Sequence, residues 1–273
     1  MKYKIAIIGS LGMVGRSLKR YFQKQNKYEL FFYDIAGEGS IEEINRADYI
    51  YLAVPTPTTE KGCDISALNK VLSDLDGEKV VIIKSTIIPG TTANLQKEFP
   101  QHKILFNPEF LTEETADKDF EIPDKQIIGY TEKSRDMAKI ILDQLPKAPL
   151  EKIVPSYVAE FIKYASNTYF SVKVAKNNEL YDVFKKFGGS DKEFEDITEA
   201  LIADPRIGNS HFKIWHNSWR GYGGKCLPKD TKAFIEFAKD LGVDTPITIS
   251  TDSYNDKLVS TFNRNRDDGQ GKK

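Results

Sequence analysis

The feature that most constrains the fold is an apolar run that ends in three glycines spaced three residues apart. Residues 5–15 read IAIIGSLGMVG, and the residues that follow read as a helix. A strand, a glycine-rich turn and a helix in this order form the unit that holds the pyrophosphate of a dinucleotide at the helix N-terminus. The spacing is GxxGxxG and not GxGxxG, so a plain structural turn is the alternative interpretation.

Asp34 supports the dinucleotide interpretation. It ends the next strand-like run, where a carboxylate accepts hydrogen bonds from ribose hydroxyls. An acid at this place also repels the 2′-phosphate of NADP, so the motif favours NAD. The residues expected to hold the nucleotide are Gly9, Gly12, Met13, Val14, Gly15 and Asp34.

The hydrophobic pattern divides the chain into two halves. Six short apolar runs lie at residues 4–9, 28–34, 48–54, 79–86, 103–109 and 125–130. Continuous runs of this length are typical of strands buried on both faces of a parallel sheet. The fold class is therefore α/β, with a doubly wound Rossmann-type domain over residues 1–150.

The second half has helical periodicity. A long amphipathic helix is expected from residue 156 to the pair Gly188-Gly189, and further helices near 191–203, 229–241 and 245–262. An apolar face of the long helix runs through Val158, Phe161, Ile162, Ala165, Tyr169 and Val172. Residues 151–262 are expected to form a helical dimerisation domain and residues 263–273 a disordered tail.

Composition excludes several classes of protein. The net charge of −1 gives no electrostatic footprint for nucleic acid. No membrane span or targeting segment is recognisable, so we expect a cytoplasmic protein. Cys63 and Cys226 lie far apart without CxxC spacing, which argues against a zinc site, any other metal centre or a disulfide framework.

The stretch RGYGGKCLPKD at residues 220–230 is the sharpest chemical motif. Its glycines allow the backbone to approach a ligand closely. Lys225 and Lys229 flank Cys226 and favour a nucleophilic thiolate. Asp230 lies four residues after the cysteine, so a helix that begins near Pro228 can bring its carboxylate back toward the sulfur. A buried structural cysteine is the alternative, and the glycines and charges argue against it.

Six ordered blocks resemble the UDP-glucose/GDP-mannose dehydrogenase family. They are YLAVPTPT (51–58), IIKSTIIPGTT (82–92), FNPEFLTEETADKDF (106–120), AEFIKYASNTYFSVKVAKNNEL (159–180), DPRIG (204–208) and GYGGKCLPKD (221–230). The resemblance implies an NAD-dependent, two-step, four-electron oxidation of a sugar-nucleotide alcohol to a carboxylate. UDP-glucose is the expected substrate, with GDP-mannose and a UDP-N-acetylhexosamine as close alternatives.

The resemblance also implies roles for individual residues. Cys226 would attack the aldehyde and carry a thiohemiacetal and then a thioester. Lys163 and Asn167, four residues apart on one helix face, would donate to the oxyanion. Asp230 and Glu109 match acid/base positions, and Thr86 matches a residue that holds water or the substrate hydroxyl.

The family pattern adds binding residues and a dimer. Further cofactor contacts are expected at Val54, Thr56, Pro57, Ser85, Thr86 and Glu113. Substrate contacts are expected at Glu109, Phe110, Leu111, Lys163, Asn167, Arg206, Tyr222 and Gly223. In the family the arginine of DPRIG reaches the sugar nucleotide of a neighbouring subunit, which would require a homodimer. Pairing with Asp204 is the simpler role for Arg206.

Two departures from the family pattern affect these expectations. The segment between Asp34 and Asp48 is short, and no basic residue closely follows Asp34. The sequence also ends where the family continues into a second domain that binds the nucleotide of the substrate. A truncated chain, a partner chain that supplies this domain and a compact member with a smaller substrate remain open. A two-electron β-hydroxyacid dehydrogenase and a catalytically silent NAD-binding scaffold are the alternative functions.

Overall fold

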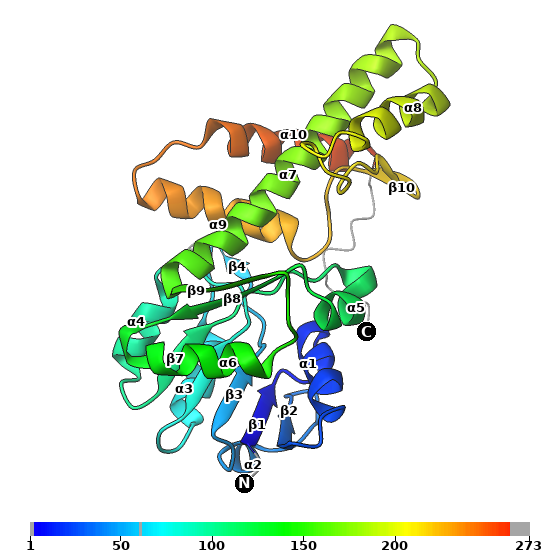
Figure 1. Ribbon diagram of the computed structural model, residues 1–273. Helices are drawn as coiled ribbons and strands as arrows, with labels where there is room; N and C mark the ends of the chain where they lie inside the picture. The colour runs from blue at the N-terminus through cyan, green and yellow to red at the C-terminus, as the bar shows by residue number, and fades with distance from the viewer. Residues whose placement is uncertain (1–2, 60–61, 263–273) are drawn as a thin grey trace. The chain divides into compact units, whose positions relative to one another are not determined.

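The computed structural model describes residues 3–59 and 62–262, which fall into two compact units, Met1–Lys163 and Tyr164–Lys273 (Figure 1). Lys163 lies inside the long helix α7 (Ser156–Phe187), so this helix contributes to both units. The boundary between the domains was expected near residue 150. In the structure the first unit also includes the strand β9 (Leu150–Pro155) and the first turns of α7. The expected tail, residues 263–273, lies outside the described residues.

The first unit is built on a seven-stranded sheet within the described part of the chain, in the order β2-β1-β3-β6-β7-β8-β9. Its strands, besides β9, are β1 (Tyr3–Ile8), β2 (Tyr28–Tyr33), β3 (Tyr49–Leu52), β6 (Val80–Ile83), β7 (Lys103–Phe106) and β8 (Lys125–Tyr130). All six predicted apolar runs are strands, which confirms the α/β class.

The strand directions correct one part of the expectation. The strands β2, β1, β3, β6 and β7, neighbours in this order, pair in parallel, as predicted. However, β8 is antiparallel to β7, with Leu105 opposite Tyr130, and β9 is parallel to β8. The segment between β7 and β8 does not cross back over the sheet. Strand β8 therefore begins beside the carboxyl end of β7 and runs in the opposite direction. The sheet is therefore mixed.

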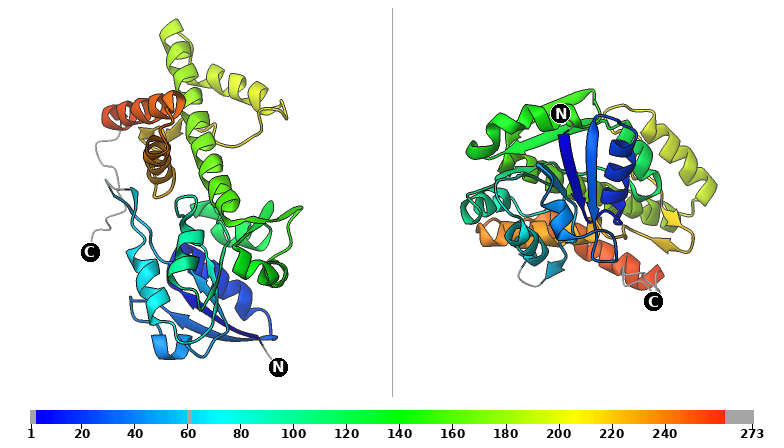
Figure 2. Two further views of the ribbon diagram at one scale, coloured as in Figure 1. Left: turned by 90° about the vertical axis from the view of Figure 1, so that its left-hand side faces the viewer. Right: turned by 90° about the horizontal axis from the view of Figure 1, so that it is seen from below.

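Helices cover both faces of this sheet (Figure 2). Ile5 and Ile7 of β1 pack in one cluster with residues of α1 (Met13–Gln23), α5 (Ala116–Glu121) and α6 (Ala138–Gln144). Ala6 and Ile8 pack in a second cluster with α3 (Ser66–Asp74), α4 (Thr91–Glu98) and the short α2 (Ile41–Ile44). Burial on both faces explains why the strand reads as an uninterrupted apolar run.

Short elements connect these layers. The strands β4 (Thr58–Thr59) and β5 (Gly62–Cys63) form a small antiparallel pair after β3. Two 3₁₀ segments, η1 (Glu113–Thr115) and η2 (Glu132–Met137), precede α5 and α6. No helix in the described residues combines the length and apolarity needed to cross a membrane.

The second unit is helical, as predicted. It contains the remainder of α7, then α8 (Asp191–Ile202), α9 (Leu227–Asp240) and α10 (Pro246–Phe262). Gly188 ends α7 with φ of 109°, and a capping box between Ser190 and Glu193 starts α8. The strands β10 (Trp215–His216) and β11 (Trp219–Arg220) form a hairpin. Tyr181, Phe194 and Ile214 form a buried apolar cluster in this helical unit.

Candidate functional site

The glycines after β1 are required by close backbone packing. Gly9 has φ of +80°, and a Cβ atom there would lie 2.4 Å from the carbonyl oxygen of Ala53. A Cβ atom on Gly15 would lie 2.0 Å from the carbonyl oxygen of Gly9. The loop, the start of α1 and the end of β3 therefore meet without side chains between them.

The N-terminus of α1 suits an anion. Gly12 is its N-cap; among the described residues no side chain caps this end, and its first turn contains no acid. The partial positive charge of a helix N-terminus favours a phosphate at such a place. Met13 and Val14 provide the first backbone N–H groups of the helix. The geometry fits the pyrophosphate of a dinucleotide.

Asp34 lies beside this helix end. Its Oδ2 accepts a hydrogen bond of 3.0 Å from the backbone N–H of Leu11, and its Oδ1 accepts one of 2.9 Å from Ala36. These bonds hold the carboxylate next to the glycine loop, where a ribose would lie on a dinucleotide bound at α1. Asp34 directly follows β2, and its role in binding a ribose stays a prediction.

Glu38 is a second acid at this place, which the sequence analysis missed. Its backbone pairs with Asp34, and its Oε2 accepts a 2.5 Å hydrogen bond from the hydroxyl of Ser10. Lys19 of α1 forms an ion pair with it. The hydrogen bonds from Lys19 and then Ser10 lower the pKa of Glu38 below its ordinary value. The sequence did contain a signal for this position. Glu38 lies four residues after Asp34, and so short a segment keeps the two acids close together.

The predicted residues after β3 and β6 are brought together, because these strands are parallel neighbours. The hydroxyl of Thr56 donates to the carbonyl oxygen of Thr86 at 2.7 Å, and that of Ser85 donates to the carbonyl oxygen of Val54 at 2.6 Å. Pro57 accepts a bond from the backbone of Asp64 at 2.8 Å. Two strand ends are thereby fixed to each other at the carboxyl edge of the sheet, where ligands bind in such folds.

Glu109 follows β7 and has a cationic neighbour on each side. Its Oε1 accepts a 2.9 Å bond from the backbone N–H of Phe110, and its Oε2 lies 2.8 Å from the buried ammonium of Lys84. The ammonium of Lys163 donates to the carbonyl oxygen of Glu109. Lys163 is only 7 % exposed, so it is not an ordinary solvated helix lysine.

The ring of Phe110 lies between two lysines. The ammonium of Lys163 is 5.4 Å from the ring centroid, and that of Lys125 is 4.1 Å from it. Burial, and then the charge of Lys163, lower the pKa of Lys125. Leu111 packs in the core on the α1 side of the sheet, and Glu113 begins η1. Phe110 is thus held beside concentrated positive charge.

A second group of predicted residues meets in the helical unit. Asn167, one turn after Lys163 on α7, donates a 2.5 Å hydrogen bond to Oδ2 of Asp230, and Lys229 pairs with Oδ1 at 2.6 Å. Asp230 is fully buried and Asn167 is 5 % exposed. The mid-helix asparagine therefore has a structural partner in the neighbouring helix α9.

Cys226 is exposed and is the N-cap residue of α9. Its carbonyl oxygen accepts a 2.8 Å bond from the backbone N–H of Asp230, which places the two residues one helical turn apart. A helix N-terminus stabilises an anionic thiolate relative to the thiol. The expectation that this thiol is not buried in an apolar core is met.

Three predicted substrate residues have other surroundings. Arg206 is exposed, and its guanidinium makes bonds of 2.9 and 2.6 Å to the carboxylate of Asp204, which is the simpler of its two expected roles. Tyr222 is buried, with its backbone N–H 2.7 Å from Asn255 of α10 and its hydroxyl 3.2 Å from Asp252. Burial is the main cause that raises the pKa of Tyr222. Gly223 lies against the ring of Trp219.

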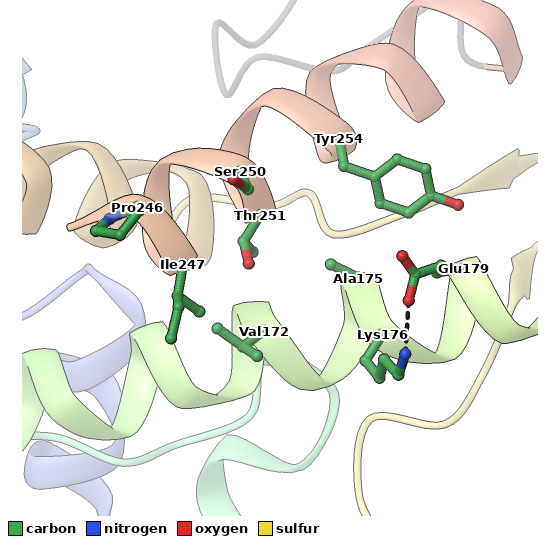
Figure 3. A pocket seen from close by; sticks show the side chains of 9 residues that line it. All are labelled: Val172, Ala175, Lys176, Glu179, Pro246, Ile247, Ser250, Thr251 and Tyr254. Atoms are coloured by element: carbon green, nitrogen blue, oxygen red, sulfur yellow. Dashed lines mark hydrogen bonds and ion pairs between the residues drawn. The ribbon is translucent and has the colours of Figure 1, made fainter.

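A groove of about 400 Å³ lies between α7 and α10 and contains none of the predicted site residues (Figure 3). Its floor is largely apolar, with Val172, Ala175 and Ile247, and the pair Lys176–Glu179 lies at one side. No cluster of three or more His, Cys, Asp or Glu side chains in the described residues is arranged to hold a metal ion.

Comparisons with known proteins show the family to which the sequence is similar. Residues 9–145 match the NAD binding domain of the UDP-glucose/GDP-mannose dehydrogenase family, and residues 157–257 match its central domain. A UDP-glucose 6-dehydrogenase of Rickettsia felis is 32% identical over 75% of this chain and 47% of its own length. One from Haloferax volcanii is 32% identical over 79% of this chain and 54% of its own length. The chain spans about half the length of the curated relatives it matches.

Solved structures show the same architecture. A UDP-glucose dehydrogenase of Pyrobaculum islandicum has a TM-score of 0.82 and 26% identity, over 94% of this chain and 68% of that one. A 3-hydroxyisobutyrate dehydrogenase of Mycobacterium tuberculosis has a TM-score of 0.74 at 15% identity, over 96% of this chain and 95% of that one. The second likeness concerns the fold alone.

Proposed function

Because the chain belongs to the UDP-glucose/GDP-mannose dehydrogenase family, we propose that it oxidises the 6-hydroxyl of a sugar nucleotide to a carboxylate with NAD, and that its substrate is UDP-glucose. One molecule of alcohol, two of NAD⁺ and one of water would give one carboxylate, two NADH and three protons. NAD, when bound, would accept one hydride in each of the two oxidation steps.

The observation that carries this proposal is the arrangement around Cys226. An exposed thiol at the N-terminus of α9 lies one turn from a fully buried carboxylate, which Asn167 and Lys229 hold in place. A two-electron dehydrogenase has no use for a thiol here. A thiolate, by contrast, adds to an aldehyde and then leaves from a thioester, which divides a difficult oxidation into easier steps.

The remaining residues have separate tasks in this proposal. Glu109 would take the proton of the substrate hydroxyl as the first hydride leaves C6. Cys226 would add to the aldehyde, and Lys163 and Asn167 would donate to the oxyanion of the thiohemiacetal. After the second hydride leaves, water would attack the thioester while Asp230 accepts its proton, and the Cys226 sulfur would depart as thiolate.

The glycine loop and Asp34 favour NAD over NADP in this proposal. Asp34 presents its carboxylate near the expected ribose position, and a 2′-phosphate would be repelled there, whereas the charge of Glu38 is paired with Lys19. The hydrogen bond from Leu11 to Asp34 fixes the carboxylate in advance of binding.

The direct test supplies the purified chain with NAD and UDP-glucose, and follows NADH by absorbance and UDP-glucuronate by mass spectrometry. Formation of both is expected, and GDP-mannose and UDP-N-acetylmannosamine serve as competing substrates. If NADH formed only with GDP-mannose or UDP-N-acetylmannosamine, the proposal that UDP-glucose is the substrate would be wrong. NAD binding without any oxidation of these sugar nucleotides would contradict the proposed activity.

A further inference from the structure

Lys84 is a buried cation to which neither the sequence nor the family comparison assigned a role. It follows β6 directly, and its side chain is 2 % exposed. Its ammonium donates a 2.7 Å hydrogen bond to Oδ1 of Asn107 and lies 2.8 Å from Oε2 of Glu109. A buried ammonium is costly unless it is paired, so these two contacts account for its presence in the unit.

The other end of this arrangement is fixed by the sheet. Asn107 is fully buried, and its Nδ2 donates a 2.9 Å hydrogen bond to the carbonyl oxygen of Ile127 in β8. That bond orients the amide, so its Oδ1 faces Lys84. The backbone of β8 thereby fixes the side-chain orientation of Asn107. Asn107 in turn fixes the position of the Lys84 ammonium, which lies beside the carboxylate of Glu109.

The two carboxylate oxygens of Glu109 have different contacts, since Oε2 lies in an ion pair but accepts no hydrogen bond in the described residues. Oε1 accepts from the backbone of Phe110, while Oε2 is buried and has the Lys84 ammonium beside it. Two other lysines lie nearby. Lys163 donates to the backbone carbonyl of Glu109 and not to its carboxylate, and Lys125 lies over the ring of Phe110. In the described part of the chain, the Glu109 carboxylate forms an ion pair with Lys84.

We propose that Lys84 is the positioning residue that holds the Glu109 carboxylate in place for proton transfer. This inference rests on the proposed function, in which Glu109 accepts the proton of the substrate hydroxyl. The bond to Asn107 fixes the Lys84 ammonium, and the ammonium in turn fixes the position of Oε2 of Glu109. Lys84 thus acts only through Glu109.

A spectroscopic experiment tests the ion pair without turnover. Isotope-edited infrared spectra at neutral pH compare the parent, Glu109→Gln and Lys84→Met, all labelled with ¹³C-glutamate. The carboxylate band that Glu109→Gln removes identifies Glu109, and we expect Lys84→Met to shift the frequency of this band, because the ion pair of 2.8 Å is lost. An unchanged carboxylate band in folded Lys84→Met would overturn the proposal.

Two further variants keep this result interpretable. Lys79→Met is a matched control, since the Lys79 ammonium donates to the carbonyl oxygens of Asn45 and Ala47 at 2.7 and 2.9 Å, and in the described part of the chain it pairs with no carboxylate. It should leave the Glu109 band unchanged. If Lys84→Met does not fold, Lys84→Gln removes the same charge while it retains a donor toward Asn107, and the same spectral change is expected.

Kinetics then separate positioning from a general loss of structure. We expect Lys84→Met to lower kcat by about 10²-fold or more, the size of a general-base contribution, with KM for the sugar nucleotide changed by no more than about threefold. In the Glu109→Gln background the same substitution should cost nothing further. If the kcat losses of Lys84→Met and Glu109→Gln multiplied in the double variant, Lys84 would act independently of Glu109. A parent without NADH formation contradicts the proposed function and leaves the infrared result to decide the role of Lys84.

Discussion

At the scale of single residues, the structure explains several polar side chains by their partners. Asn167 is a poor helix former within α7, and its bond to the buried Asp230 supplies the reason for its presence. Arg206 pairs with Asp204, two residues away, and this local contact was readable from the sequence. Lys84 was not readable, because a lysine after an apolar run resembles an ordinary strand end. Its pairing with Glu109 depends on β6 and β7 being neighbours.

Asp34 carries a residue-scale prediction. Asp34→Ala removes the carboxylate that accepts from Leu11 and that would accept from the ribose. Hydrogen bonds to a charged group contribute about 1.5–3 kcal/mol, so the dissociation constant for NAD should rise about 10- to 100-fold. Calorimetric titration with NAD measures this change. An unchanged constant would mean that the glycine loop is only a structural turn.

At the scale of elements, hydrophobic periodicity predicted most strands and helices. The long helix was expected between residue 156 and Gly188, and α7 occupies Ser156–Phe187. The strand β9 was missed because its sequence, LEKIVP, contains two adjacent charged residues and ends in proline, which fits its place at the sheet edge. The antiparallel direction of β8 was also missed. Strand direction depends on how the connecting segment runs and leaves no trace in apolar content.

The prediction at this scale concerns the contact between Gly15 of α1 and Gly9, which follows β1. In Gly15→Ala the new Cβ atom would lie 2.0 Å from the carbonyl oxygen of Gly9, so backbone must move. We expect a loss of about 1–3 kcal/mol in the free energy of unfolding, as for other overpacked sites, together with weaker NAD binding.

Gly12→Ala is the matched control for this prediction. Its Cβ atom would lie 3.3 Å from the same oxygen, so only a small adjustment is needed. Urea denaturation of both variants measures the difference. Equal stability of Gly15→Ala and the parent would show that this contact does not constrain the loop.

At the scale of the whole molecule, we propose a homodimer formed through the helical unit. The expected apolar face of α7 is only partly covered, since Tyr169 is 73% exposed and Phe161 is 46% exposed. Further along the helix Val183 is 66% and Phe187 85% exposed. Several large apolar side chains in the open on one helix are typical of a protein interface.

The dimer is tested by charge introduction on this helix. Phe187→Glu should weaken self-association at least about tenfold, because a carboxylate in an apolar interface is desolvated without a partner. Ile122→Glu, at a position 74% exposed in the sheet unit, is the control and should leave the sedimentation coefficient unchanged. A parent that sediments as a monomer at every concentration would contradict the dimer.

The most direct test of the central claim is the number of NADH molecules formed for each UDP-glucose consumed, in the parent and in Cys226→Ser. The parent should give two NADH and UDP-glucuronate, because the thiol carries the sugar between the two oxidations. Cys226→Ser should give at most one NADH, with the sugar left at the aldehyde level. Two NADH from Cys226→Ser at the parent's rate would contradict the account.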